Sequence, residues 1–271
     1  MSGSVTFGVA PVGQPSANIF QEGWWSLGGE YSMSEIDLDL ENSSDTSFFT
    51  EKTIESLDIN LMLGKAGYCL KDNWEVFVGF GTVDTSGIGK DETSEDWGNN
   101  PAYKQINSFE YDLGSGSAAQ IGTKYTFYEK AQIKAGIACQ LTWLNLSGTV
   151  EENVYKETQE DGSRELSAND QTDVDSDLYI VQIAPGISYE VAFGYSIYGG
   201  PLFQWVTGKS ETKSSNSLLF DTKTEYDVKN SASFGGWVGL RADIDAFISV
   251  SLDYQKVGSS STIGLNLTSK F

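Results

Sequence analysis

The sequence contains no histidine, two cysteines (Cys69 and Cys139) and five prolines in 271 residues. The absence of histidine removes the residue that most often serves as an acid–base catalyst or a transition-metal ligand. Two cysteines are too few for a disulfide framework, and they lie on predicted strands that are not neighbours, so we expect both to be free. No apolar run approaches the roughly 18 residues that a membrane-spanning helix needs.

Basic residues are also scarce, since 17 Lys and Arg stand against 38 Asp and Glu, and the formal net charge is -21. A chain of this charge repels a phosphate backbone, so nucleic acid is not an expected partner. Residues Met1 to Gln14 have neither the basic start nor the apolar core of a secretion signal. If the protein is exported, we therefore expect that a leader has been removed before Met1.

The chain is rich in segments in which apolar and polar residues alternate, and aromatic residues make up 13 % of it. The last segment places Ile263, Leu265, Leu267 and Phe271 on one face of a strand and polar residues on the other. From Trp24 onward, short turns alternate with long polar connections. The ten predicted strands lie around residues 25–33, 57–63, 74–80, 113–125, 133–143, 179–189, 195–205, 234–240, 248–254 and 263–271.

A closing strand that ends in Phe271, after nine alternating segments, resembles small bacterial outer-membrane β-barrel proteins. The resemblance extends over residues 24–271 and is to the OmpA-like, OmpX-like or porin-like class. It implies an all-β, transmembrane, antiparallel up-and-down β-barrel of about ten strands, with long acidic extracellular loops and short periplasmic turns. Residues 1–23, which are rich in Gly, Ser and Pro, are predicted to form an N-terminal tail or a plug in the lumen.

A soluble β-sandwich or closed barrel would also alternate, with its apolar face buried and its outside charged. Here the polar faces carry Gly, Ser, Asn, Gln and isolated charges, and the apolar faces begin or end in Trp or Tyr. Such rings are expected where a barrel crosses the two membrane interfaces, which favours the membrane barrel. The predicted aromatic belt consists of Trp25, Tyr31, Trp74, Tyr125, Trp143, Tyr179, Tyr189, Tyr195, Trp205 and Tyr254.

Charged residues on the polar faces are predicted to form an ionic network in the lumen. The alternative is a selectivity lining for a pore, but ten strands lie near the size that side chains fill, which favours a structural network. Phe77, Tyr198 and Trp237 are bulky inward candidates. The same assignment points the apolar face of the second strand, Leu57 to Leu63, toward lipid. The predicted network consists of Glu30, Asp58, Glu75, Lys124, Lys134, Glu190, Arg241, Asp253 and Lys270.

The long connections, around residues 84–107, 151–176 and 208–229, are acidic. Carboxylates are hard ligands that suit Ca²⁺ or Mg²⁺, and Asp170, Asp173 and Asp175 are the candidates for such a site. Their spacing matches no known calcium loop, so a solvated acidic surface is favoured and no cofactor is expected. Divalent ions that bridge these loops to lipopolysaccharide are a secondary possibility.

The resemblance includes enzymes, notably the omptin proteases and the outer-membrane phospholipases, but their sites use a histidine that this chain lacks. We therefore expect no enzyme. The favoured function is an integral outer-membrane barrel with a structural or surface-interaction role, which presents acidic loops to extracellular or envelope partners. The alternatives are a narrow porin-like channel or transporter for small solutes and, less favoured, a rim-located enzyme.

The resemblance also implies a location and a set of partners. Phe271 corresponds to the assembly signal that the barrel-assembly machinery recognises in this class. Outer-membrane lipid and lipopolysaccharide would surround the barrel, both termini would be periplasmic, and the loops would lie at the cell surface of a Gram-negative envelope. Cys139 would face lipid, and Cys69 would lie near a periplasmic turn.

Overall fold

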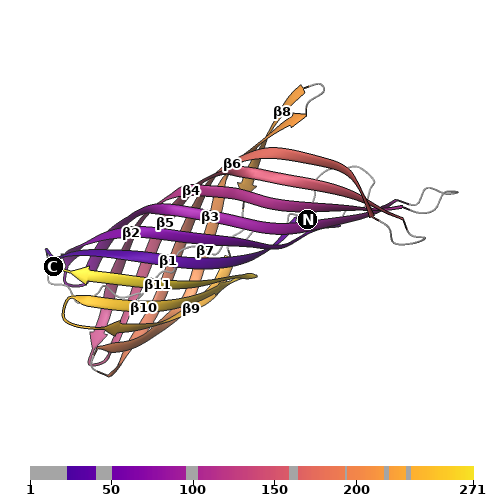
Figure 1. Ribbon diagram of the computed structural model, residues 1–271. Coiled ribbons are helices and arrows are strands. Elements are labelled where there is room, and N and C mark those ends of the chain that lie inside the picture. Colours follow the sequence, from indigo (N-terminus) through magenta and orange to yellow (C-terminus); the bar gives the residue numbers. More distant parts are fainter. Residues whose placement is uncertain are drawn as a thin grey trace.

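A computed structural model describes residues 23–40, 51–95, 103–158, 164–192, 194–216, 220–229 and 233–271. The described residues form a closed antiparallel β-barrel (Figure 1). Among them, no helix is long and apolar enough to cross a membrane. Residues 1–22 of the predicted tail or plug lie outside the described residues. The strands are β1 (Trp25–Leu40), β2 (Glu51–Lys71), β3 (Trp74–Glu95), β4 (Tyr103–Lys130), β5 (Ile133–Thr158), β6 (Arg164–Ala192), β7 (Tyr195–Asn216), β8 (Phe220–Lys229), β9 (Ser233–Asp243), β10 (Ile248–Val257) and β11 (Ser260–Lys270).

Strands that follow one another in the sequence pair with each other, except β8 and β9, and the first and last strands join to complete the cylinder. β1 pairs with both β2 and β11. β7 pairs with β8 over one part of its length and with β9 over the other, so β8 and β9 share one position in the wall. The barrel therefore has ten strand positions, as the alternation predicts. Every backbone group in such a wall can pair within the protein, which is what hydrocarbon demands.

A row of cross-strand partners, followed once around the barrel, returns to β7 shifted along the strand. The row leaves from Ser196 and returns at Gly208, a stagger of 12 residues. With ten strands, this stagger corresponds to a strand tilt of about 40° and a backbone radius of roughly 10 Å. The intervening residues are Arg241, Ser251, Asn266, Glu30, Leu63, Gly81, Ala118, Leu144 and Leu178.

Large apolar side chains are exposed on the outer face of every strand position, which is the arrangement that a barrel in lipid requires. On β11, for example, Ile263, Leu265 and Leu267 are each at least half exposed. Trp143 is half-buried, and the other nine residues of the predicted aromatic belt are exposed. The register groups five of the ten near the short turns, namely Trp25, Trp74, Tyr125, Tyr189 and Tyr195.

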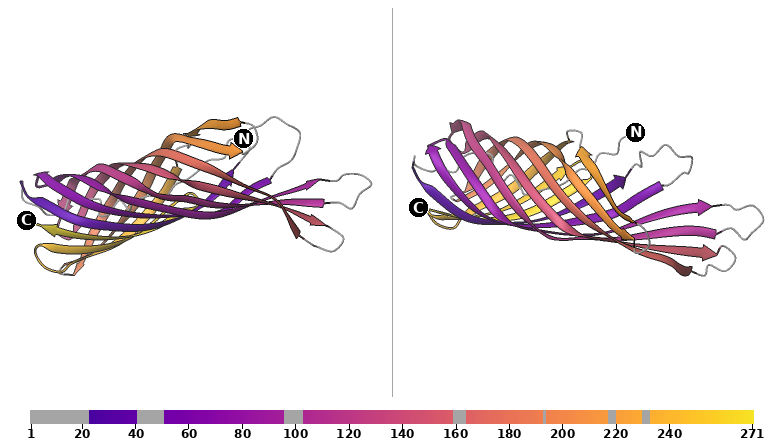
Figure 2. Two further views of the ribbon diagram at one scale, coloured as in Figure 1. Left: turned by 45° about the horizontal axis from the view of Figure 1, so that its top comes forward. Right: turned by 90° about the horizontal axis from the view of Figure 1, so that it is seen from above.

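The strands differ greatly in length, and the wall is much taller on one side (Figure 2). β4, β5 and β6 have 28, 26 and 29 residues, whereas β9, β10 and β11 have 11, 10 and 11. Because a transmembrane strand needs about 9–11 residues, the short strands just span a bilayer and the long ones continue far beyond it. Much of the sequence predicted as polar loop, including 84–95 and 164–176, is therefore strand.

The predicted orientation of β2 is wrong. Ile59, Leu61 and Leu63 are 1–2 % exposed and point into the lumen, whereas Asp58 and Met62 are exposed on the outer face. The assignment failed because it assumed that the apolar face of every strand meets lipid. Part of the lumen of this barrel is itself apolar. At the level of Ile59, which faces the lumen, the outer face of β2 carries the polar residue Asp58.

Candidate functional site: a layered lumen

The inward side chains change character in the same order along several neighbouring strands. On β4 the order from the short turns toward the long strand ends is Lys124, Gly122, Gln120 and Ala118. On β2 it is Lys65 followed by three aliphatic residues. The interior is therefore built in layers, with charged groups near the short turns, amides in the middle and aliphatic side chains toward the tall rim.

The charged layer is held by ion pairs and by aromatic rings. The Lys65 ammonium forms an ion pair with Glu30, whose side chain is fully buried. Lys65 also lies 5.2 Å from the centroid of the Phe77 ring, and the Lys124 ammonium lies 5.7 Å from the same ring. Glu75 is the cross-strand neighbour of Lys124. Cations are attracted to the ring face, so Phe77 helps two lysines to share a small space.

A second group of contacts completes this layer on β7, β9, β10 and β11. The Tyr198 hydroxyl donates a hydrogen bond of 2.7 Å to Asp253 Oδ1, and Asn266 Nδ2 donates one of 3.0 Å to Asp253 Oδ2. Arg241 Nη2 and Nε donate to Asp243 Oδ1 at 2.7 and 2.9 Å. A buried carboxylate is tolerated only when donors of this kind surround it.

The structure separates the predicted lumen network into two groups. Glu30, Glu75, Arg241, Asp253 and Lys270 are buried, and Lys124 and Lys134 are half-buried. Two members lie elsewhere: Glu190 is exposed at the end of β6, and Asp58 is on the outer face of β2.

One lumen residue, Lys65, was missed in the sequence. Lys134, which was predicted, has an ion-pair partner at the end of the barrel with the short turns. Lys65 escaped notice because β2 was assigned the opposite orientation. Its position two residues after Leu63, on the same face, was the available signal. Lys134 forms an ion pair of 2.8 Å with Glu129, whose side chain is 58 % exposed.

Above the charges lies a ladder of glutamines. Gln140 Nε2 donates to Gln182 Oε1 at 2.5 Å, and Gln182 Nε2 donates to Gln204 Oε1 at 2.9 Å. Gln120 Nε2 donates to Thr142 Oγ1 at 3.1 Å. All five side chains are at most 4 % exposed. Gln182 both donates and accepts, and together these bonds connect the four adjacent strands β4 to β7, which favours one register.

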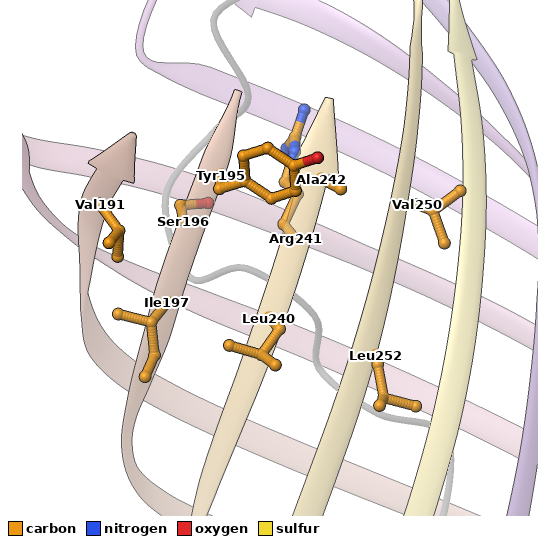
Figure 3. Close-up of a pocket in the computed structure, with 9 residues that line it drawn as sticks. All are labelled: Val191, Tyr195, Ser196, Ile197, Leu240, Arg241, Ala242, Val250 and Leu252. Carbon is orange, nitrogen blue, oxygen red and sulfur yellow. The ribbon is translucent and has the colours of Figure 1, made fainter. Parts of the chain in front are cut away.

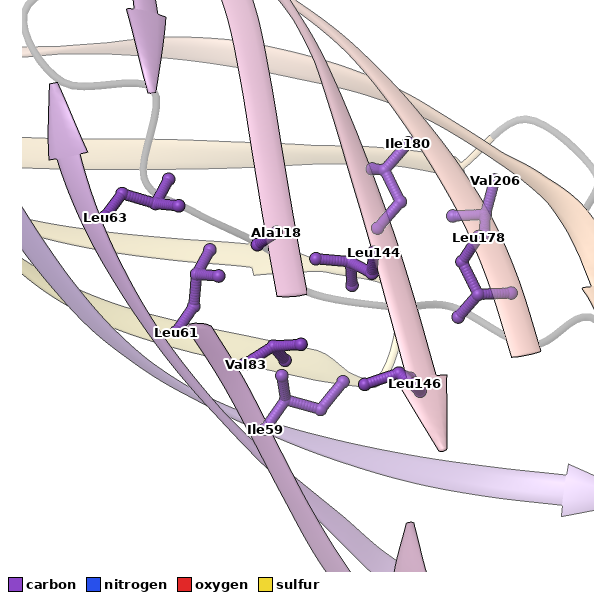
Figure 4. Packing of buried hydrophobic residues seen from close by; sticks show 10 residues of the cluster. All are labelled: Ile59, Leu61, Leu63, Val83, Ala118, Leu144, Leu146, Leu178, Ile180 and Val206. Carbon is purple, nitrogen blue, oxygen red and sulfur yellow. The ribbon is translucent and has the colours of Figure 1, made fainter. Parts of the chain in front are cut away.

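Toward the tall rim, ten aliphatic side chains from six adjacent strands form a buried cluster on the inside of the wall (Figure 4). Leu61 and Val83 are cross-strand partners, as are Leu144 and Leu178. We call this group the apolar layer. Its members are at most 3 % exposed and are Ile59, Leu61, Leu63, Val83, Ala118, Leu144, Leu146, Leu178, Ile180 and Val206.

Aromatic side chains fill space in the lumen beside the charged residues. Tyr198 and Trp237 are 2 % and 5 % exposed, with ring centroids 5.4 Å apart. Gly239 makes room for them, because a Cβ there would collide with the Tyr198 ring and with Asp253. Gly122 does the same for Phe77. The three bulky residues predicted to point inward therefore all fill the lumen.

The acidic residues proposed as metal ligands do not converge in the part of the chain that the structure describes. Asp173 and Asp175 are exposed on the outer face of β6, and the side chain of Asp170 lies outside the described residues. Among the described residues, no group of three or more acidic or cysteine side chains could hold a metal ion. Asp177, two residues further on, instead accepts hydrogen bonds from Trp143 Nε1 at 3.2 Å and Asn145 Nδ2 at 3.0 Å.

The two cysteines are free, and their environments differ. Cys69 is 1 % exposed near the end of β2, and its thiol donates to the carbonyl oxygen of Lys71 at 2.8 Å. Cys139 lies on the outer face of β5 and is half-buried, as predicted for a lipid-facing residue. Neither cysteine takes part in the lumen layers.

The sequence matches no family model and no curated protein. Among solved structures, the chain is similar to the outer membrane protease OmpT from Escherichia coli, with a TM-score of 0.55 and 10 % identity over 94 % of this chain and 99 % of that one. It also matches Ail of Yersinia pestis (TM-score 0.32, 13 % identity, 93 % and 100 % covered) and the toluene transporter TbuX of Ralstonia pickettii (TM-score 0.41, 11 % identity, 96 % and 91 % covered).

The similarity to OmpT shows a shared fold alone, and the similarities to Ail and TbuX are weaker still. A closed ten-position barrel with an apolar outer face is the fold of the small bacterial outer-membrane β-barrel proteins, which confirms the resemblance seen in the sequence. The chain thus has the fold of outer-membrane barrel proteins. A fold shared at 10 % identity does not bring an activity with it, so the particular role of this chain depends on its own residues.

Proposed function

We propose that this protein is a closed, non-conducting barrel that presents an acidic wall to partners at the cell surface. The observation that carries the proposal is the filled lumen. Buried aliphatic, amide and aromatic side chains follow one another along the barrel, and the apolar layer is at most 3 % exposed. Ions cross an apolar constriction poorly, because nothing there replaces their hydration shell.

The tall wall supplies the surface. The parts of β3 to β7 that rise beyond a bilayer's thickness carry exposed acids on their outer face, including Asp84, Glu151, Asp173, Asp175 and Asp177. Like charges at this density attract cationic partners and repel anionic ones. The partner class that fits is therefore a basic protein or peptide segment, or anionic lipopolysaccharide bridged by divalent cations.

The proposed orientation places the short turns in the periplasm, together with the start of β1 and the end of β11. Trp25 and Phe271 lie side by side there, because the backbone N–H of each donates to the carbonyl of the other at 3.0 Å. In barrels of this class short turns face the periplasm and long connections face outward. On this orientation the tall wall is extracellular.

No catalytic role is proposed. OmpT is named a protease, but this chain has no histidine. The buried carboxylate of Glu30 is paired with Lys65, and that of Asp253 accepts hydrogen bonds from Tyr198 and Asn266.

Conductance in planar bilayers tests the closed lumen. We expect the wild type to be silent and the double variant Tyr198→Ala, Trp237→Ala to leak ions, because it removes two rings from the lumen. Trp205→Ala, which removes an exposed ring from the outer face, is the matched control and should stay silent. Steady openings of the wild type would instead support the narrow-pore alternative.

Binding of a cationic peptide to protein in neutral vesicles tests the acidic wall. We expect oligolysine to bind the wild type and to bind more weakly after Asp173, Asp175 and Asp177 are all changed to Asn. The binding should vanish near 1 M salt, where the Debye length is about 3 Å. Equal binding by the triple variant would show that these acids do not form the contact surface.

A further inference from the structure

Two hollows indent the lipid-facing surface of the barrel near the short turns. The larger, about 540 Å³, spans β2 to β5, and we call it the Lys71 hollow. The smaller, about 420 Å³, lies across β6, β7, β9 and β10, and we call it the Arg241 hollow (Figure 3). The lining of the Lys71 hollow is formed by Lys71, Asn73, Trp74, Thr123, Tyr125, Ile137 and Cys139.

The floor of the Lys71 hollow is low because small residues stand between large ones. Thr123 and Cys139 are cross-strand partners, and Trp74 and Tyr125 form the next row. The indole of Trp74 is fixed, since its Nε1 donates a 2.7 Å hydrogen bond to Thr123 Oγ1. Thr123 in turn donates 2.8 Å to the carbonyl of Glu75. The ring is thereby held as a wall of the hollow.

The hollow is amphipathic along its length. Lys71 is exposed at the end of β2, beside the two-residue turn, and Asn73 is anchored there by a hydrogen bond of 3.2 Å from its Nδ2 to the Thr126 carbonyl. Trp74 and Tyr125 are exposed at the same level, where such rings mark the head-group region. Along the hollow, a cation is followed by aromatic rings and then by an apolar floor. This order matches the phosphate, glycerol and acyl chain of a phospholipid.

We propose that the Lys71 hollow binds one glycerophospholipid of the periplasmic leaflet, with its phosphate at the Lys71 ammonium and an acyl chain over Cys139. The proposal rests on the orientation given under Proposed function. The lipid site does not depend on the closed lumen or on the acidic wall. An experiment can therefore refute the lipid site and leave the other two proposals intact.

The Arg241 hollow provides a comparison within the same molecule. Its outer lining is apolar, including Leu240, Ala242 and Val250. Its cation does not face the bilayer, since Arg241 is 8 % exposed and donates two hydrogen bonds to Asp243. An acyl chain can lie in this hollow, but no exposed cation selects a phosphate.

Native mass spectrometry of the full-length protein in detergent tests the proposal. The probes are phosphatidylglycerol and a diacylglycerol with the same chains, each titrated separately. We expect one phosphatidylglycerol to bind in preference to diacylglycerol. Lys71→Gln should weaken phosphatidylglycerol binding about fivefold, the factor expected for one surface cation, and leave diacylglycerol unchanged. Cys139→Phe, which fills the floor, should weaken both.

Three further variants make the result specific. Lys130→Gln removes an exposed cation from the β4–β5 turn at the same end and should change nothing. Ala242→Phe fills the Arg241 hollow and should leave phosphatidylglycerol binding intact, and Lys71→Arg should retain it. Equal weakening by Lys71→Gln and Lys130→Gln, or equal affinity for the two probes, would overturn the proposal. Anomalous gel migration of unheated samples verifies that every variant is folded.

Discussion

The ion pair between Glu30 and Lys65 is the most direct test of whether the lumen is held together from within. The Glu30 side chain is fully buried, and that of Lys65 is 19 % exposed. Changing Glu30 to Gln keeps the shape but leaves the Lys65 ammonium without its counter-charge. The Phe77 ring also lies near, with its centroid 5.2 Å from the Lys65 ammonium, but a second cation, Lys124, already faces that ring.

The size of the effect follows from this burial. Removing one partner of a buried ion pair costs about 3–5 kcal/mol, and the partial exposure of Lys65 places the expected loss near 3 kcal/mol. The double variant Glu30→Gln, Lys65→Met removes both charges, so we expect it to recover about 2 kcal/mol of that loss as a coupling energy.

Urea unfolding in detergent micelles, followed by tryptophan fluorescence, measures these free energies. Glu129→Gln is the matched control, because Glu129 pairs with Lys134 at 2.8 Å but is 58 % exposed. That change should cost less than about 1 kcal/mol. If Glu30→Gln and Glu129→Gln cost the same, or if the double variant shows no coupling, the lumen charges do not stabilise the barrel as described.

Three further predictions concern packing, strand orientation and assembly. Gly239→Ala should lower the free energy of unfolding by about 1–3 kcal/mol, because the new Cβ collides with the Tyr198 ring; a change below about 0.5 kcal/mol would contradict this packing. In a background without native cysteines, Asp58→Cys should react with a membrane-impermeant maleimide and Ile59→Cys should not, and the reverse pattern would restore the predicted orientation of β2. Deleting Phe271 removes two backbone hydrogen bonds to Trp25 and should lower the fraction of folded barrel in cells, measured by heat-modifiable gel migration, whereas an unchanged fraction would argue against an assembly role.

Most of the barrel could be predicted from the sequence because lipid imposes a simple rule on the outer face. Where a strand is apolar on one side and carries Gly, Ser or Gln on the other, as β1, β5 and β11 do, the apolar side faces out. Tyr31, Cys139 and Leu265 are on the outer face for this reason. The count of strand positions followed from the same alternation.

The orientation of β2 was predicted wrongly from its alternation, because alternation shows that one face is apolar but not what that face touches. Ile59, Leu61 and Leu63 belong to a core that five other strands complete, and those partners are distant in sequence. Only Lys65, on the same face as these residues, would have indicated the lumen. A lysine near the middle of a lipid-facing row would be costly.

The lengths of the tall strands were missed for a different reason. Around Asp173 and Asp175 the outer face of β6 is acidic, whereas Val174 and Ser176 on the inner face are buried. The apolar outer face that marks a membrane strand is missing there, so the sequence was read as loop. Backbone pairing continues there regardless: Asp173 pairs with Thr149 on one side and Lys213 on the other. Acidic loops were therefore expected from the sequence, whereas the structure shows that much of this acidic sequence is strand.

The unequal strand lengths make the molecule a tube with one end cut at a slant (Figures 1 and 2). Among the described residues, β9, β10 and β11 end close to the thickness of a bilayer, whereas β3 to β7 continue well beyond it on the other side of the barrel. The surface that a partner meets in the plane of the bilayer thus depends on its direction of approach. The tall sheet of β3 to β7 therefore offers a lateral contact surface that the short strands do not provide.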